Sequence, residues 1–313
     1  MAVPVVTAPT RGPAPPRTRR GGLWAALAAP GIIWLAVFFI FPLYVVLCIV
    51  FGGVDPIFRT PVPVWNPLQW DPTQFSYVLT HIVGSNGVFG PAILRTFIFV
   101  LLASCLCLSI AFPVAYYVAR LSGKRKGLLL ALLIAPFWIS YMMRMFAWVN
   151  LLQDDGLFNK ILSFGGVFHP DVKWLTGQPA VVVLGLVYGY VPYMILPLYA
   201  GLDRLSQPML EASRDLGADR FSSFWRVTLP LCRPTIVAAV LLTCLPMLGD
   251  YFTSDMLSAS PKTAMVGNMI NDSVQSPGQT GQAGAFVMLV FLAALLPMLY
   301  YIRVTSRPDE VST

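Results

Sequence analysis

The sequence predicts an all-α membrane protein with six transmembrane helices. Hydrophobic residues make up 57% of the 313 residues and charged residues only 11%, and the mean hydropathy is +0.70. A soluble globular domain carries about 25% charged residues. The apolar residues gather in runs of at least ~20, the length that a helix needs to cross a hydrocarbon core of about 30 Å. The length of the chain allows one membrane domain and nothing large outside the bilayer.

Six apolar runs divide the chain. Residues 1–22 are rich in Pro, Arg, Ala and Thr without an apolar period, which predicts a disordered basic tail. The six-helix domain then covers residues 23–303, and residues 304–313 form a short cytoplasmic tail. The predicted spans are Leu23–Val50, Phe89–Val118, Leu128–Leu152, Pro179–Leu202, Pro234–Leu257 and Ala283–Ile302.

Lys and Arg residues are divided unevenly between the two sides of these spans. Fifteen of the 21 lie in the two tails, at Arg303 just before the second tail, in the loop 120–126 and in the longer loop 203–233, whereas four lie in the opposite loops. Loops rich in Lys and Arg stay in the cytoplasm. We therefore expect a multi-pass protein of the plasma membrane with both termini and loop 203–233 in the cytoplasm. This topology accounts for the formal charge of +7, so membrane lipid is an expected partner and nucleic acid is not.

Loop 203–233 is the long charge-rich segment between spans, and its pattern predicts two short helices around a hinge. Ser206 suits the N-cap of the first helix. Gly217 stands where a left-handed residue ends that helix. Asp219 suits the cap of a second helix, which we expect Pro230 to end.

The spacing inside this loop resembles the EAA loop of ABC-importer permeases. Glu211-Ala212-Ser213, three residues, Gly217, nine residues and Val227-Thr228-Leu229-Pro230 stand where the family has EAA, three residues, G, nine residues and I-x-L-P. Ser213 and Val227 depart from that pattern. In this family the loop is a coupling helix that docks in a groove of the ATPase subunit; the alternative is an ordinary elbow between two spans. The resemblance implies that the coupling residues are Glu211, Ala212, Ser213, Arg214 and Gly217.

A wider resemblance covers the chain from about Arg95 to the end of the sixth span. The passages that carry it are Phe112–Tyr116, Arg144–Trp148, Tyr190–Tyr199, Gly249–Phe252 and Gly267–Ile270. Through them the chain is similar to the spermidine/putrescine permeases of the PotB/PotH type. The resemblance implies a type I ABC importer permease fold and a polyamine substrate. It also implies three kinds of partner: a second homologous permease, a dimer of ATP-binding subunits and an extracytoplasmic substrate-binding protein.

Catalytic and cofactor motifs do not stand out in the sequence. The nucleotide-binding loop G-x-x-x-x-G-K-[ST] does not occur, so ATP and Mg would be bound by partner subunits and the chain itself would be no enzyme. The five cysteines all fall in or beside apolar runs, which argues against a disulfide framework or a thiolate metal site. His81 and His169 are isolated in the sequence, so we expect no metal and no cofactor in this chain.

An acidic residue near the end of the fifth span suggests a path for a cationic substrate. A charged group inside a span is costly unless it faces a bundle interior or a water-filled path. Asp250 beside Tyr251 offers an ammonium group a negative charge and an aromatic face. We expect both to line the passage, with Trp148 and Tyr193 as further aromatic contacts. The alternative is that such aromatics only anchor the helices at the membrane interface.

Arg144 lies in the third span and would repel a polyamine. We expect it to pair with an acidic residue, either Asp154 or Asp250, and so to hold a gate closed. Other functions remain open on the sequence alone. They are an importer for a sugar or an inorganic anion, a secondary transporter, and a membrane-embedded enzyme.

Overall fold

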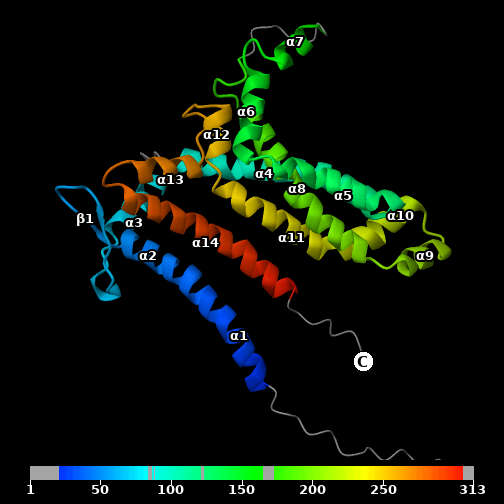
Figure 1. Ribbon diagram of the computed structural model, residues 1–313, viewed down its shortest axis with the longest axis horizontal. Coiled ribbons are helices and arrows are strands. Elements are labelled where there is room, and N and C mark those ends of the chain that lie inside the picture. Colours follow the sequence, from blue (N-terminus) through cyan, green and yellow to red (C-terminus); the bar gives the residue numbers. More distant parts are fainter. Residues whose placement is uncertain (1–20, 84–86, 88, 121–122, 165–172, 306–313) are drawn as a thin grey trace, which may run out of the picture. The chain divides into compact units, whose positions relative to one another are not determined.

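The computed structural model describes residues 21–83, 87, 89–120, 123–164 and 173–305. Within these residues the chain is largely helical, as the sequence predicts (Figure 1). The predicted N-terminal tail up to residue 20 and residues 306–313 of the C-terminal tail lie outside the described residues. Residues 304 and 305 continue the last helix instead of opening the tail.

The N-terminal part of the chain, up to Leu47, is described by itself. It is one apolar helical stretch, made of α1 (Gly21–Leu35), a π-helical turn η1 (Ala36–Ile40) and most of α2 (Phe41–Val50). The helical stretch Leu27–Val50, which continues past Leu47, has 24 residues and is long enough to cross a membrane.

A small folded loop follows the first span. Strands β1 (Gly53–Val54) and β2 (Pro61–Val62) form an antiparallel pair, in which Gly53 lies opposite Val62. A 3-10 turn η2 (Pro67–Gln69) and helix α3 (Thr73–Val83) complete the loop.

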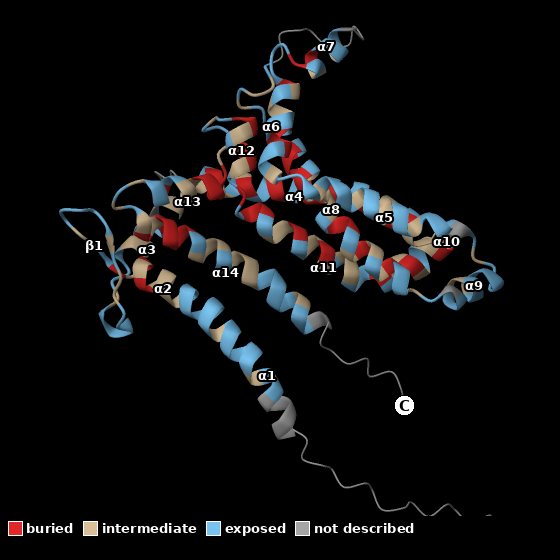
Figure 2. Cartoon of the chain, in the orientation of Figure 1, coloured by how far each residue is buried: buried red, intermediate tan, exposed pale blue. Residues whose placement is uncertain are grey.

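Three long helices form the core of the part from Cys48 onward: α4 (Gly90–Arg120), α8 (Pro179–Arg204) and α11 (Leu229–Leu248). The buried residues of these helices face one another, as Figure 2 shows in red. Small side chains repeat every four residues along the buried face of α4. Because lipid is as apolar as leucine, close packing of such small residues holds membrane helices together. This stripe consists of Ala103, Cys107, Ala111 and Ala115, all fully buried.

Other helices of the part from Cys48 onward pack against this core or lie at its ends. The last span, α14 (Thr280–Thr305), packs against α3, α11 and α13 (Val266–Gln275). Short helices and turns lie at the ends of the long ones. Their bounds are η3 (Gly123–Arg125), α7 (Leu157–Phe164), α9 (Gln207–Asp215), α10 (Arg220–Ser223) and α12 (Phe252–Leu257).

The predicted third span, Leu128–Leu152, is wrong as one continuous helix. It consists of α5 (Lys126–Ile134), a 3-10 turn η4 (Ala135–Trp138) and α6 (Tyr141–Leu152). The helical segments on either side of the break lie at 84° to each other, and Figure 1 shows α6 turning sharply away from α5. Pro136 cannot donate a backbone hydrogen bond and Ile139 has an extended backbone, so the helix ends there. The described chain thus has five helices long and apolar enough to cross a membrane, or six if this bent pair is one span.

The predicted fifth span, Pro234–Leu257, is wrong at both ends. Helix α11 ends at Leu248, and residues 249–251 separate it from α12. At the other end, α10 runs through the π-helical turn η5 (Phe224–Thr228) into α11. Pro230 therefore lies in a first helical turn and does not end the second helix of loop 203–233, as the sequence predicts it would. A π turn widens the helix just before the proline ring, which relieves its clash with the preceding carbonyl.

Candidate functional site

The segment 203–233, called the elbow below, contains two helices around a glycine hinge, as predicted. Helix α9 begins after Ser206, although the Ser206 side chain makes no capping hydrogen bond in the described structure. Gly217 has φ +86° and donates its N–H to the carbonyl of Arg214 at 2.8 Å. The next N–H, of Ala218, reaches the carbonyl of Ser213 at 3.1 Å. These two bonds form the Schellman motif, which needs a left-handed residue and therefore favours glycine.

Asp219 caps the second helix of the elbow, as the sequence predicts. Its carboxylate accepts hydrogen bonds from the N–H groups of Phe221 (3.3 Å) and Ser222 (3.2 Å). Hydrogen bonds from Ser222 lower the pKa of Asp219 below its ordinary value of 3.8, and the hydrogen bond from Phe221 lowers this pKa by a smaller amount. The cap is therefore charged at neutral pH, where a negative charge stabilises a helix N-terminus.

Ser213, one of the two departures from the EAA pattern, joins the two elbow helices. Its hydroxyl lies 2.7 Å from the hydroxyl of Ser223, which is buried, and donates to the carbonyl of Leu210 at 2.8 Å. An alanine at position 213 could make neither bond. In this chain the serine therefore adds a direct link between α9 and α10.

The outer surface of the elbow is exposed and partly apolar. Glu211, Ala212 and Arg214 all face solvent in this chain, and Figure 2 shows α9 in pale blue. Beside them, the side chain of Leu216 is 89% exposed and that of Phe221 is 70% exposed. Exposed large apolar side chains among charged ones are typical of a surface that contacts another protein.

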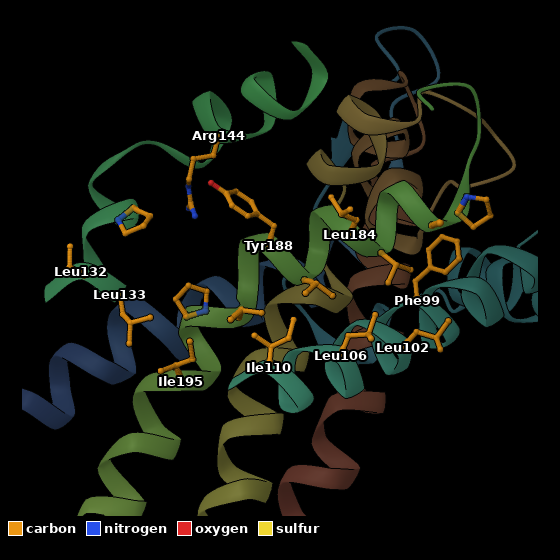
Figure 3. A pocket seen from close by; sticks show the side chains of 17 residues that line it. Phe99, Leu102, Leu106, Ile110, Leu132, Leu133, Arg144, Leu184, Tyr188 and Ile195 are labelled. Carbon is orange, nitrogen blue, oxygen red and sulfur yellow. The ribbon is translucent and has the colours of Figure 1, made fainter. Parts of the chain in front are cut away.

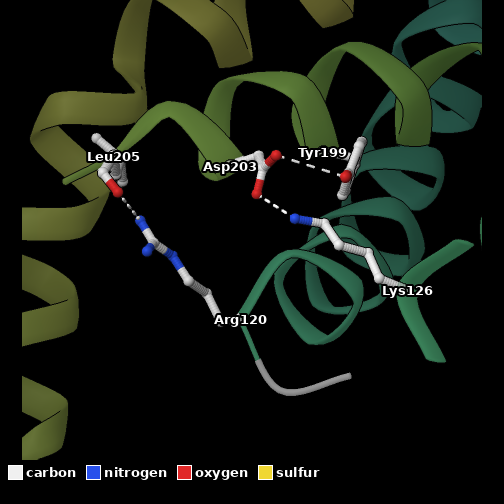
Figure 4. A network of polar contacts seen from close by, with 5 residues as sticks. All are labelled: Arg120, Lys126, Tyr199, Asp203 and Leu205. Atoms are coloured by element: carbon white, nitrogen blue, oxygen red, sulfur yellow. Dashed lines mark hydrogen bonds and ion pairs between the residues drawn. The ribbon is translucent and has the colours of Figure 1, made fainter. Parts of the chain in front are cut away.

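Polar contacts join the base of the elbow to the turn between α4 and α5 (Figure 4). Lys126 at the start of α5 forms an ion pair with Asp203 near the end of α8. Arg120 at the end of α4 donates a hydrogen bond of 2.8 Å to the carbonyl of Leu205. Tyr199 lies beside this pair, with its ring centroid 5.2 Å from the Lys126 ammonium nitrogen. A movement of the elbow would thus act directly on the ends of α4, α5 and α8.

A second polar site lies at the break between α11 and α12. Asp250 is 7% exposed, and its Oδ2 atom accepts hydrogen bonds from the hydroxyls of Tyr141 and Tyr190, each at 3.1 Å. Thr253 donates its hydroxyl to Oδ2 at 2.6 Å and its N–H to Oδ1 at 3.0 Å. These residues come from α6, α8 and α12, so one carboxylate joins three helices. We call Asp250, Tyr141, Tyr190 and Thr253 the Asp250 network.

Two glycines allow this close packing. A Cβ atom on Gly189 of α8 would lie 2.7 Å from the ring of Tyr141. A Cβ atom on Gly267 of α13 would lie 2.7 Å from the carbonyl oxygen of Gly249 and 2.8 Å from the backbone of Asp250. Contacts this short would force the neighbours apart, so both positions depend on the absence of a side chain.

Asn268 fixes the chain around the break. Its amide oxygen accepts from the hydroxyl of Ser254 and from the N–H of Met265, each at 2.7 Å, and its amide nitrogen donates to the carbonyl of Tyr251 at 3.1 Å and to the carboxylate of Asp255. A buried amide with both ends bonded holds the backbone in one arrangement. The Tyr251 side chain itself remains exposed.

The predicted pairing of Arg144 with Asp154 or Asp250 is wrong for the described part of the chain, where the one ion pair is that of Lys126 and Asp203. Tyr141 stands between the expected partners. Its hydroxyl bonds to Asp250, while its ring centroid is 5.4 Å from the Arg144 guanidinium carbon. Asp154 is exposed on the loop after α6, away from the buried guanidinium.

Tyr193 and Trp148, the two aromatic residues predicted to contact the substrate in the passage, pack against different residues. Tyr193 is exposed and packs on Tyr190 at a centroid distance of 5.9 Å. Trp148 packs edge-on against Tyr188 at 5.3 Å and has no direct bond to Asp250. The structure therefore brings Tyr193 next to the Asp250 network and leaves Trp148 beside Arg144.

Sequence reasoning missed Tyr141 and Tyr190. Both are tyrosines inside apolar helices, where a buried hydroxyl needs a hydrogen-bond partner. The sequence alone allows this rule to be applied, because it shows Asp250 as an acidic residue at the end of a span that could accept such a hydrogen bond. The pairing itself joins residues 109 and 60 positions apart, which no local pattern reveals.

Membrane helices without a nucleotide-binding motif, joined by an exposed elbow with EAA spacing, define the permease subunit of an ABC importer. The family described as "Binding-protein-dependent transport system inner membrane component" matches residues 111–305. The match covers more than half of the chain, which belongs to this family of inner membrane permeases.

Several relatives carry permease names. The chain is 31% identical over 271 residues to the spermidine/putrescine transport system permease protein PotB of Haemophilus influenzae, covering 86% of this chain and 89% of the relative. It is 38% identical over 170 residues to PotB of Escherichia coli (strain K12), covering 54% and 61%. It is also 32% identical to the E. coli inner membrane ABC transporter permease protein YdcU, covering 70% and 74%.

Solved structures share the fold at low sequence identity. A chain of a bacterial alginate ABC transporter, solved in complex with an alginate pentasaccharide-bound periplasmic protein, superposes with a TM-score of 0.68 at 18% identity, covering 94% of this chain and 98% of that chain. A chain of the MetNI methionine ABC transporter in an inward-facing conformation superposes with a TM-score of 0.51 at 17% identity, covering 68% and 92%. These likenesses establish the type I importer permease fold.

Proposed function

We propose that this permease carries polyamines, spermidine or putrescine, into the cell. The observation that carries the proposal is the similarity to PotB of H. influenzae, which extends over 89% of that protein. The chain would work with a second homologous permease, a dimer of ATP-binding subunits and an extracytoplasmic substrate-binding protein. Both termini and the elbow would face the cytoplasm, as the distribution of Lys and Arg favours.

In this proposal the elbow receives force from the ATP-binding subunits. Its exposed face offers charged contacts at Glu211 and Arg214 and an apolar contact at Leu216. Closure of the ATPase dimer would move α9 and α10 together, because the Gly217 turn and the bond between Ser213 and Ser223 join them. The movement would then pass through the base of the elbow to α4, α5 and α8, shifting the permease between two conformations.

The Asp250 network is the proposed place where this movement meets the substrate. Asp250 is covered in the described conformation by two tyrosine hydroxyls, so an ammonium group could reach its carboxylate only after α6 or α8 moved away. The exposed rings of Tyr251 and Tyr193 lie beside the network and would offer aromatic faces to a cation. Trp148 would serve further along the passage.

Uptake into proteoliposomes tests the proposed substrate. The complete complex would be reconstituted with ATP inside and its binding protein outside, and labelled spermidine, putrescine and maltose would be offered in turn. We expect ATP-dependent accumulation of a polyamine and none of maltose. Accumulation of the sugar without a polyamine would refute the substrate assignment, and accumulation without ATP would refute the importer class.

A further inference from the structure

An apolar groove of about 810 Å³ lies between α4, α5, α6 and α8 (Figure 3). It has the volume of a small-molecule site. Arg144 is the one charged residue that lines it, and nearly all other lining side chains are aliphatic or proline. Figure 3 shows Arg144 and Tyr188 pointing toward each other on one side of the groove. Side chains on its other sides include Leu102, Leu106, Ile110, Leu132, Leu133 and Ile195.

Arg144 forms no ion pair with any residue in the described part of the chain. Its side chain is 7% exposed, and its Nε atom is buried without a hydrogen-bond partner. Aromatic rings surround the guanidinium carbon, with the centroids of Phe137 at 5.1 Å, Tyr141 at 5.4 Å and Tyr188 at 6.0 Å. Ring faces attract a cation but provide no negative charge. A guanidinium held in an apolar setting therefore strongly favours an anion as its partner.

We propose that the groove binds an anionic phospholipid, with the phosphate at Arg144 and an acyl chain along the leucines of α4 and α5. Two properties of the groove support this occupant. It combines one cation with a long apolar lining, which matches the charged head and apolar chain of such a lipid. A guanidinium also donates two parallel hydrogen bonds to a phosphate, a geometry that an ammonium group does not offer.

The position of the groove gives the lipid a structural role. It lies over the 84° break between α5 and α6, with Leu132, Leu133 and Pro136 on one side of the break and Arg144 on the other. A lipid that contacts the residues on both sides of the break would stabilise the bent conformation. The inference rests on Arg144 and the apolar lining of the groove, and the substrate assignment rests on the likeness to PotB and on the Asp250 network, so the two are tested separately.

Native mass spectrometry of the purified transporter complex tests the proposal. The complex would be exchanged into phosphatidylglycerol or into phosphatidylcholine with the same acyl chains, and the lipid retained would be measured for each variant. We expect wild type to retain phosphatidylglycerol preferentially and R144Q to lose about tenfold in affinity, as expected for a lost charge-assisted hydrogen bond. R144K should retain part of the preference.

Matched variants separate the groove from general effects. L106W fills the groove while leaving Arg144 intact, so it should also reduce retained phosphatidylglycerol. L101W places the same ring on α4 outside the groove, and R95Q removes another span arginine, which donates to the carbonyl of Pro261 at 2.8 Å. Both should bind phosphatidylglycerol like wild type.

Four outcomes would overturn the proposal. One is equal retention of the two lipids by wild type, and another is equal phosphatidylglycerol retention by wild type, R144Q and L106W. A third is release of a protein subunit from R144Q without a change in lipid, which would assign the guanidinium to a carboxylate of that subunit. Displacement of phosphatidylglycerol by millimolar inorganic phosphate would likewise point to a small-anion site.

Discussion

The elbow and the Asp250 network use opposite physical designs. In the elbow, the Gly217 turn and the Asp219 cap are made within a few residues of chain, and the surrounding side chains are exposed. The Asp250 network joins residues 60 and 109 positions apart, and within it Asp250 and Thr253 are buried while the two tyrosines are half-buried. This difference indicates which region can move as a unit and which region holds the helices in place. A locally built lever keeps its shape when it is pushed, whereas a long-range buried network holds helices in one arrangement until its bonds are broken.

Replacement of Asp250 by alanine should have the largest effect on stability. It would leave two tyrosine hydroxyls and the groups of Thr253 without their acceptor, which we expect to cost about 3 kcal/mol. The measurement is thermal unfolding of the assembled complex in nanodiscs. D154A, which removes an exposed carboxylate, is the control and should unfold near the wild-type temperature. Equal unfolding temperatures for D250A and D154A would mean that the network does not hold the helices together.

Replacement of Gly267 by alanine should have the next largest effect. The new Cβ atom would meet the backbone of Gly249 and Asp250, and such overpacking costs about 1–3 kcal/mol. G127A is the matched control, since a Cβ atom there has no neighbour within 4 Å. The same thermal unfolding assay should separate the two variants. If they behave alike, the contact around the Asp250 backbone is looser than described.

Replacement of Gly217 by alanine should act locally and sharpen the comparison. A Cβ atom there meets nothing within 4 Å, so its cost comes from φ +86° alone and is about 1 kcal/mol. G123A places an alanine at another open site with positive φ, outside the elbow. Hydrogen exchange should show faster opening of α9 in G217A and not in G123A, while both complexes unfold near the wild-type temperature. Equal exchange of α9 in both variants would contradict a structural role for the turn.

The smallest effect concerns the pH dependence of the elbow. Because hydrogen bonds from Ser222 and Phe221 lower the pKa of Asp219, its cap is fully present at neutral pH and is lost as the pH falls below about 4. Exchange rates of the Phe221 and Ser222 amides, corrected for intrinsic rates, should therefore rise below that pH in wild type. In D219N the acid-dependent change should be absent. A wild-type profile as flat as that of D219N would show that the carboxylate does not cap α10.

The sequence predicted those features that depend on neighbouring residues. Apolar runs located the spans, and the hinge at Gly217 and the cap at Asp219 followed from helix-end rules. The same rules failed at Pro230, because a π turn before it lets the helix continue. They also missed the break at Ile139, since a proline in an apolar run is compatible with either a kink or an end.

Features that depend on tertiary contacts could not be predicted from the sequence. Asp250 was identified as a candidate from its position, but its partners Tyr141 and Tyr190 come from other helices. Arg144 was expected to meet an acidic residue because a buried charge needs compensation. The structure instead places aromatic rings around it. A rule that pairs each buried charge with an opposite charge does not predict this arrangement.

The number of substrate molecules transported per ATP hydrolysed tests most directly whether the elbow couples ATP hydrolysis to transport. The measurement would compare the wild-type complex with a double variant, E211A with G217A, after confirming equal assembly and equal unfolding temperatures. We predict that the double variant hydrolyses ATP but moves little substrate, because the lever no longer passes force to the spans. Transport per ATP equal to that of wild type would contradict the account.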